Sequence, residues 1–176
     1  MAERRDDPGP DHAPEVTRLA IEGVIVERFP TVRYEHGALT EIVNASWGDM
    51  FAQPIGHLYM LDNAGPRARD EWYVHHVVTD RYVLVDGMLD LALFDARDGS
   101  PTNGELVVTS LLPIGADGPS GVTIPAGVWH SFRYRSERMM LINAKVPGYN
   151  REAPDKYRLP MPNEHTDFRW SAHPVP

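Results

Sequence analysis

Short apolar runs separated by turn residues recur about every ten residues through the middle of this chain. Gly, Asp, Asn or Pro stands in most of the gaps. This spacing is typical of a sandwich or barrel, and no segment has the length and periodicity of a long helix. The sequence therefore predicts an all-β fold, a jelly-roll β-barrel. The runs are RLAIEGVIVERF, LTEIVNASW, IGHLYMLD, EWYVHHVV, RYVLVDG, MLDLALFDA, ELVVTSLL, GVTIPAG, HSFRYR and MMLINAKV.

A length of 176 residues favours one domain with irregular ends. Residues 1–14 are charged and proline-rich, and we expect a disordered arm there. Residues 15–146 are predicted to form the barrel. Residues 147–176 are again rich in Pro, Asn and charge, so we expect an irregular segment that covers the barrel surface with its aromatic side chains.

Composition excludes several classes of partner and site. A formal net charge of −8 repels nucleic acid and anionic membranes, so neither is an expected partner. An anionic substrate would need positive charge supplied locally by the site. The chain has no cysteine, so any metal site would consist of His and carboxylate ligands. No run is long enough for a membrane span, and the start lacks the apolar middle of a signal peptide, which predicts a soluble cytoplasmic protein.

Two histidine-bearing segments, EWYVHHVVTDRYVLVDG (71–87) and VTIPAGVWHSF (122–132), resemble the two signature motifs of the cupin superfamily. The second segment keeps the Pro-x-Gly-x-x-His pattern and ends on His130. In the first segment, Tyr73 stands where the leading histidine of the motif would be, and Asp80 replaces its glutamate. The resemblance implies that Tyr73, His75, Asp80 and His130 converge at one mouth of the barrel.

A narrower resemblance covers most of the chain. The run DLALFDARDGSPTNGELVVTSL followed by VTIPAGVWHSF is similar to the dTDP-4-dehydrorhamnose 3,5-epimerase family. GALTEI lies where that family has an Arg-Gly-aromatic-x-x-Glu segment, and YNREAPDKYRLPMP resembles a late Tyr-x-x-x-x-Pro-Asp-Glu stretch. The resemblance implies an enzyme that inverts carbons next to a ketone on a nucleotide-linked sugar. Such chemistry needs a base, a donor to the enolate oxygen and an acid on the other face.

The chain departs from the family at its functional positions. The family's catalytic histidine falls at Tyr73, with His75 in place of a glutamine. The lysine that holds the enolate falls at Asp80, beside Arg81. The tyrosine acid falls near Ile142 or Asn143. The arginine that contacts diphosphate falls at His36, and the aspartate that orients the catalytic histidine has no counterpart. The chain thus resembles the family in its scaffold, whereas the residues at the family's catalytic and binding positions differ.

Candidate site residues follow from these matches and from strand alternation. The catalytic candidates are His75 or Tyr73 as the base, with His130 as an electrophilic or positioning group. His76 is expected to face away from His75. The candidate substrate-binding residues are His57, Tyr59, Arg81, Trp129, Asn143 and Lys145.

Three functions remain open. The first is a metal-free isomerase or epimerase that does acid–base chemistry beside a carbonyl, with a small molecule such as a dTDP-sugar as substrate and no cofactor. The second is a metal-dependent cupin, in which His75, Asp80 and His130 bind Fe, Mn or Zn. The third is a cyclase-like or binding pocket for an apolar carbonyl intermediate of secondary metabolism, suggested by the loss of phosphate contacts. For all three we expect a homodimer formed through an edge strand or swapped arm.

Overall fold

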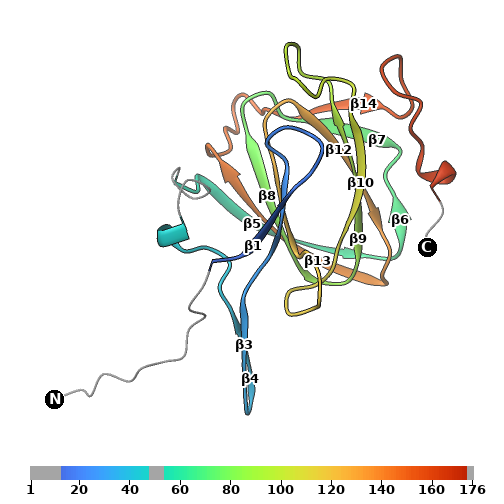
Figure 1. The fold of residues 1–176 in the computed structure, drawn as a ribbon. Helices are drawn as coiled ribbons and strands as arrows, with labels where there is room; N and C mark the ends of the chain where they lie inside the picture. Colours follow the sequence, from blue (N-terminus) through green and yellow to red (C-terminus); the bar gives the residue numbers. More distant parts are fainter. Residues whose placement is uncertain (1–12, 48–53, 174–176) are drawn as a thin grey trace.

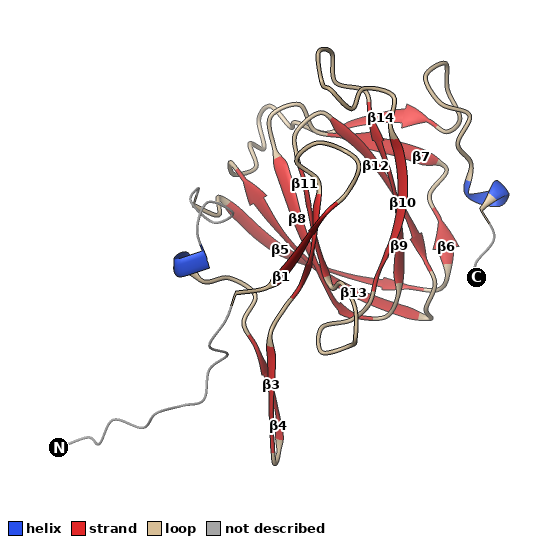
Figure 2. Cartoon of the chain, in the orientation of Figure 1, coloured by secondary structure: helices blue, strands red, loops and turns tan. Residues whose placement is uncertain are grey.

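The computed structural model describes residues 13–47 and 54–173, which form a nearly all-β barrel of two facing sheets (Figures 1 and 2). Of the predicted N-terminal arm, residues 1–12 lie outside the described residues, and the first strand begins at Glu15. No helix in the described ranges is long and apolar enough to cross a membrane. The all-β jelly-roll prediction is confirmed.

The first sheet has six strands in the order β1-β2-β11-β8-β13-β5. All of its neighbouring strands pair antiparallel. Strand β5 alternates half-buried and exposed residues along its length, as expected for an edge strand with one face toward the barrel interior. The strands are β1 (Glu15–Arg18), β2 (Ile25–Arg28), β5 (His57–Ala64), β8 (Thr79–Asp86), β11 (Gly121–Ile124) and β13 (Arg138–Val146).

The second sheet has the order β10-β9-β12-β7-β14, and a short strand β6 pairs with β12. Every residue of β9 is buried, so its sequence LDLALFD reads as a nearly continuous apolar run rather than an alternating one. The strands are β6 (Arg67–Ala68), β7 (Glu71–Val74), β9 (Leu89–Asp95), β10 (Leu106–Leu111), β12 (Val128–Tyr134) and β14 (Tyr157–Pro160).

A separate hairpin of β3 (Thr31–Tyr34) and β4 (Gly37–Thr40) projects away from the barrel (Figure 1). The structure ends this strand pair earlier than the run LTEIVNASW predicts. The side chain of Asn44 accepts hydrogen bonds from the backbone N–H and the hydroxyl of Ser46, which closes a tight turn instead of continuing a strand.

Two further differences from the predicted strands affect the site. The run EWYVHHVV is a strand only to Val74, and the chain then bends over residues 75–78 before β8 begins. The C-terminal segment contains a strand that its composition does not predict, because β14 pairs antiparallel with β7. This segment also ends in a short 3-10 turn, η2 (Trp170–Ala172).

Two apolar clusters lie on the two faces of the second sheet. The larger one fills the barrel between the sheets and includes Leu91, Leu93 and Phe132. The other lies on the outer face, where Phe168 and Trp170 of the C-terminal segment pack with residues such as Trp72, Phe94 and Trp129. The C-terminal segment therefore buries an outer sheet face that would otherwise be an exposed apolar surface.

We predict that Gly87→Ala destabilises the fold more than Gly99→Ala does. Both glycines have positive φ, 90° and 75°, which disfavours any side chain by about 1–2 kcal/mol. A Cβ at Gly87 would also collide with the backbone carbonyl of Arg138, whereas nothing lies within 4 Å of a Cβ at Gly99. We expect Gly87→Ala to lower the free energy of unfolding by about 1–3 kcal/mol more than Gly99→Ala in urea titrations. Equal losses in the two variants would contradict this reading of the turn.

Candidate functional site

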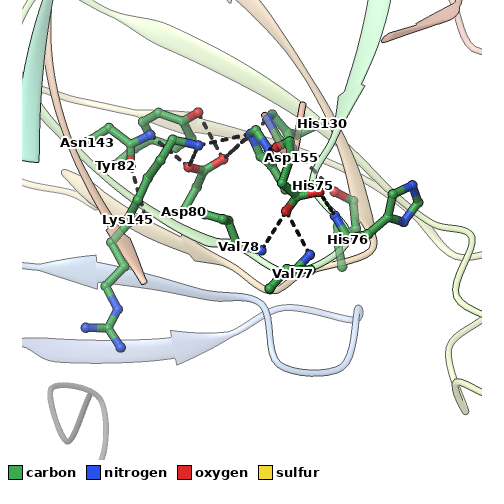
Figure 3. A network of polar contacts seen from close by, with 12 residues as sticks. His75, His76, Val77, Val78, Asp80, Tyr82, His130, Asn143, Lys145 and Asp155 are labelled. Atoms are coloured by element: carbon green, nitrogen blue, oxygen red, sulfur yellow. Dashed lines mark hydrogen bonds and ion pairs between the residues drawn. The ribbon is translucent and has the colours of Figure 1, made fainter. Parts of the chain in front are cut away.

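A buried carboxylate, Asp80 of β8, lies at the centre of the candidate site (Figure 3). Its position follows from the strand register, because Asp80 lies directly opposite Lys145 of β13 in the antiparallel ladder. Directly opposed residues of such a pair point to the same face of the sheet, here the barrel interior. Asp80 and Lys145 are 1% and 4% exposed, so water contributes little to the solvation of either charge.

Both oxygens of Asp80 are engaged by neighbouring side chains. Oδ1 lies 2.6 Å from Lys145 Nζ and accepts a hydrogen bond of 2.8 Å from Asn143 Nδ2. Oδ2 lies 3.2 Å from His75 Nε2 and accepts a hydrogen bond of 3.3 Å from the Tyr82 hydroxyl. Burial alone would raise the pKa of Asp80, but the hydrogen bond that a protonated His75 donates to it, together with the charges that His130, His75 and Lys145 carry when protonated, holds that pKa well below its usual value. Asp80 is therefore an ionised group that organises its neighbours.

His75 lies in the bend that follows β7, and three contacts fix it. Its backbone carbonyl accepts a hydrogen bond of 2.6 Å from the N–H of Gly127, in the turn that precedes β12. Its ring Nδ1 contacts the carbonyl oxygen of Asp155. A carbonyl only accepts, so Nδ1 carries a proton. The other ring nitrogen, Nε2, faces Lys145 Nζ at 3.0 Å and Asp80 Oδ2 at 3.2 Å.

Asp155 holds this bend in place from the C-terminal segment. Its carboxylate accepts hydrogen bonds from the backbone N–H groups of His76, Val77 and Val78 at 2.8, 2.8 and 2.9 Å (Figure 3). These bonds satisfy three donors that the end of β7 leaves without ladder partners. Burial acts to raise the pKa of Asp155, but the three backbone bonds and His75 bring it below its ordinary value. Asp155 thus positions both the bend and the ring of His75.

His130 of β12 lies beside this cluster from the opposite sheet. It pairs in register with Tyr73 of β7, and its ring centroid is 6.2 Å from that of Tyr73 and 5.7 Å from that of His75. Its Nε2 lies 3.7 Å from Asp80 Oδ2. Burial lowers the pKa of His130 to about 4, although the charge of Asp80 acts in the opposite direction. The imidazole of His130 is therefore neutral at neutral pH.

The cluster lines one side of a cavity of about 360 Å³ between the two sheets. Aromatic side chains form much of the remaining wall, as is common for small-molecule pockets. Three cationic side chains also face the cavity. The lining residues are His57, Tyr59, Leu61, Asn63, Arg69, Tyr73, His75, Tyr82, His130, Phe132, Tyr134, Lys145, Tyr149 and Lys156.

Two tyrosines on opposite sheets differ in the state of their hydroxyl groups. Tyr59 of β5 accepts a hydrogen bond of 2.9 Å from Asn143 Nδ2, which leaves its own proton available to the cavity. Tyr73 of β7 instead donates its proton to the carboxylate of Glu71. Burial raises the pKa of both tyrosines, and the bond to Glu71 raises that of Tyr73 further. Both hydroxyls are therefore protonated at neutral pH.

The structure brings most of the sequence-predicted residues to this cavity. His57, Tyr59, Tyr73 and Lys145 line it together with His75 and His130. Asn143 is fully buried and reaches the cavity only through its hydrogen bonds to Tyr59 and Asp80.

Arg81 and Trp129 were placed among the substrate-binding candidates, and the structure puts both elsewhere. Arg81 follows Asp80 on β8, so alternation turns its side chain to the outer face of the first sheet, near Glu27. Trp129 precedes His130 on β12 and is turned to the outer cluster of the second sheet, 5.5 Å from the ring of Phe94. His36 lies exposed on the projecting hairpin.

Several cavity residues were missed by the sequence analysis. Arg69 comes from a loop, where neither a strand pattern nor a matched motif indicated it. Lys156 comes from the C-terminal segment and lies in the matched run YNREAPDKYRLPMP, where it stands at the glutamate of the motif, but no strand pattern indicated that it lines the cavity. Tyr82 shares a face of β8 with Asp80, so strand alternation from Asp80 would have found it. The role of Asp155 has one signal in the sequence, the late Pro-Asp pair within YNREAPDKYRLPMP.

The cluster also contains a set of potential metal ligands. Among the described residues, His75, Asp80 and His130 each offer one ligand atom, and these atoms lie within 4.8 Å of one another. Two imidazoles and a carboxylate suit Fe²⁺, Mn²⁺ or Zn²⁺ by atom type. The Nε2 of His75 and one oxygen of Asp80 are, however, already in contact with the ammonium group of Lys145.

Comparisons with known proteins support the fold resemblance. No family model matches the chain. A probable low-salt glycan biosynthesis epimerase of Haloferax volcanii, Agl13, is 29% identical over 141 residues, which cover 78% of this chain and 86% of that protein.

Among solved structures, a dTDP sugar isomerase from Desulfovibrio desulfuricans aligns with a TM-score of 0.77 and 21% identity, covering 90% of this chain and 97% of that one. A dTDP-4-dehydrorhamnose 3,5-epimerase from Elizabethkingia anophelis aligns with a TM-score of 0.71 and 14% identity, covering 94% and 88%. The chain has the cupin-like fold of these enzymes.

We predict that Asp155→Ala releases the ring of His75, because the carboxylate anchors to the bend the same residue whose backbone carbonyl contacts Nδ1. Losing the carboxylate leaves three backbone N–H groups without their acceptor, which should lower the free energy of unfolding by about 2 kcal/mol. The ¹⁵N shifts of His75 should change from the Nδ1–H tautomer toward the Nε2–H tautomer or a mixture. Glu152→Ala removes an exposed carboxylate from the same segment and should change neither quantity. If the His75 tautomer is unchanged in Asp155→Ala, Asp155 does not position the ring of His75.

We also predict that His130 makes the fold less stable in acid. The unfolded histidine takes up a proton near pH 6.5, whereas the buried ring stays neutral until about pH 4. Stability is therefore fully present above about pH 6.5 and is lost as the pH falls toward 4, by at most about 1.4 kcal/mol per pH unit. In urea titrations across this range, His130→Asn should show a shallower decline than the unaltered chain. His165→Asn, at an exposed position, should keep the original slope, and parallel curves for all three proteins would contradict the burial argument.

Proposed function

We propose that this chain is an epimerase or isomerase that moves a proton at a carbon next to the carbonyl of a nucleotide-linked keto-deoxysugar. The fold it shares with dTDP-sugar isomerases and epimerases supports the class of reaction. One observation carries the proposal further: His75, the ammonium group of Lys145 and the hydroxyl group of Tyr59 come together at one cavity.

His75 is the proposed base. Its proton on Nδ1 is held by the carbonyl of Asp155, so Nε2 is the atom that accepts the substrate proton. When Nε2 gains that proton, it becomes a donor to Asp80 Oδ2, 3.2 Å away. The buried negative charge of Asp80 thus stabilises the imidazolium form that proton abstraction creates, as an orienting carboxylate does in other acid–base enzymes.

Lys145 is the proposed donor to the enolate oxygen. As the C–H bond breaks, its electron pair moves into the carbonyl group and the oxygen becomes negative. The ammonium of Lys145 adjoins the base and lines the cavity, so it can donate a hydrogen bond to that oxygen. A donor held in place before the reaction in a buried site contributes about 10²–10³-fold in rate.

Tyr59 is the proposed acid that returns a proton to the opposite face of the carbon. It comes from β5 of the first sheet, whereas His75 follows β7 of the second sheet, so the two side chains reach the cavity from different strands. From the sequence, Tyr59 was a substrate-binding candidate and Tyr73 an alternative base, but the Tyr73 hydroxyl donates its hydrogen bond to Glu71. Tyr73 then acts as a wall of the sugar pocket.

Arg69 and Lys156 are proposed to supply the positive charge that a diphosphate group needs in an acidic chain. Both line the cavity, whereas His36 lies exposed on the projecting hairpin. Burial lowers the pKa of Lys156, and the charges of Arg158, Lys145 and Arg69 lower it further. Several positive groups therefore gather at this part of the site, and an anion among them would relieve their mutual repulsion.

A homodimer remains part of the proposal. The hairpin β3–β4 extends from the barrel with mostly exposed residues, and a two-stranded sheet alone is marginally stable in water. On the outer face of edge strand β5, Leu58 and Met60 are 61% and 54% exposed. A second copy of the chain covering these features would bury them, and light scattering coupled to gel filtration measures the assembly directly.

We predict that the protein incorporates solvent deuterium next to the carbonyl of a dTDP-4-keto-6-deoxy sugar in D₂O. His75→Asn should lower this incorporation by about 10²–10⁴-fold, because the base is lost. Tyr59→Phe should keep incorporation on the original face while losing inversion, since only the returning acid is removed. Proton NMR distinguishes the two outcomes in one experiment. Tyr157→Phe, at an exposed tyrosine that does not line the cavity, should behave as the unaltered chain.

Two results would overturn this assignment. A complete absence of deuterium incorporation by a folded protein that binds the sugar nucleotide would remove the reaction. Thermal stabilisation by apolar carbonyl compounds with none by dTDP or its sugars would favour the binding-pocket alternative instead.

A further inference from the structure

The Asp80 cluster has the ligand atoms of a metal site and an ammonium group among them. His75, Asp80 and His130 are all buried, and their ligand atoms lie within 4.8 Å of one another in the described part of the chain. A metal bound to such a set would take the lone pair of His75 Nε2 and one carboxylate oxygen, at distances of about 2.0–2.2 Å.

Lys145 already uses the same atoms. Its Nζ is 3.0 Å from His75 Nε2 and 2.6 Å from Asp80 Oδ1. A divalent cation that bound both groups would lie within a few ångströms of the ammonium, and two positive charges so close together in a buried site repel strongly. The residues present therefore do not fit a metal while the ammonium group of Lys145 lies among them.

The position of Lys145 is fixed by the architecture of the sheet. Lysine side chains usually extend to water, but this one is 4% exposed and lies across the ladder from Asp80. His57 of β5 flanks it in register on the other side. A change of rotamer that removed the ammonium from the cluster would leave Asp80 without its closest cationic partner.

We propose that the ammonium group of Lys145 is the resident cation of this cupin-like site and prevents divalent metals from binding to His75, Asp80 and His130. The ammonium balances the charge of Asp80, as a metal would, and it also donates hydrogen bonds. Removing it leaves three ligand atoms and an open position, which is the arrangement of a catalytic zinc or ferrous site. The proposal concerns the cluster alone and holds whatever the substrate is.

Titration with Co²⁺ and Zn²⁺ tests the proposal by a readout that does not involve activity. The unaltered protein should bind no stoichiometric metal at this site. Lys145→Met should bind one Co²⁺ per chain, with a visible spectrum of nitrogen and oxygen coordination and an affinity at least about 100-fold tighter than that of the unaltered protein. Excess Zn²⁺ should raise the melting temperature of the variant. Lys145→Gln is the second variant, to be used if the methionine variant does not fold.

Two controls locate the bound metal. Lys156→Met removes a cation from the same cavity outside the cluster, and it should stay metal-free. The double variant Lys145→Met with His130→Asn should lose the new site, because one of its ligands is gone.

The proposal is overturned by any of three results. One is a folded Lys145→Met or Lys145→Gln protein that binds Co²⁺ no better than the unaltered chain. Another is new binding that survives the loss of His130. The third is stoichiometric metal in the unaltered protein that depends on His75 and His130.

Discussion

The burial of one ionised carboxylate, Asp80, determines the arrangement of the whole site. A charge removed from water is stable only when other groups replace its solvation, and here Lys145, Asn143, His75 and Tyr82 do so. Each of these side chains is consequently held in one position. The positions of the candidate catalytic side chains thus follow from their contacts with Asp80. The register of the surrounding strands makes these contacts possible, because it places Lys145 opposite Asp80.

Local patterns in the sequence were sufficient to predict the all-β architecture. Alternation and turn residues identify strands such as β8 and β13, and the Pro-Ala-Gly turn before His130 correctly marks the entry to β12. The predicted strands were wrong where contacts between distant segments of the chain determine the secondary structure. Val74 ends β7 because Asp155, far along the chain, captures the next backbone N–H groups. Strand β14 forms because β7 offers it an edge, against the preference of its own proline-rich composition.

The site residues could be predicted from the sequence only where a motif within one short segment identifies them. His75, Tyr73 and His130 follow from motif matches, and Asp80 from its spacing. The importance of Lys145 does not, because the sequence alone does not say that β13 pairs with β8 in the register that sets it opposite Asp80. Arg81 and Trp129 were candidates for substrate binding, but each directly neighbours an inward-facing residue in its strand, and strand alternation places such a neighbour on the other face.

The attachment of His75 to the C-terminal segment has a consequence for a chain that a protease cuts. All strands of the barrel walls up to β13 precede Asp155 in the sequence. The residues just before Asp155, 150–154, are exposed, and exposed loops are the preferred sites of proteolytic nicking. A chain that loses everything after such a cut keeps every strand of the first sheet but lacks the carbonyl that orients the ring of His75.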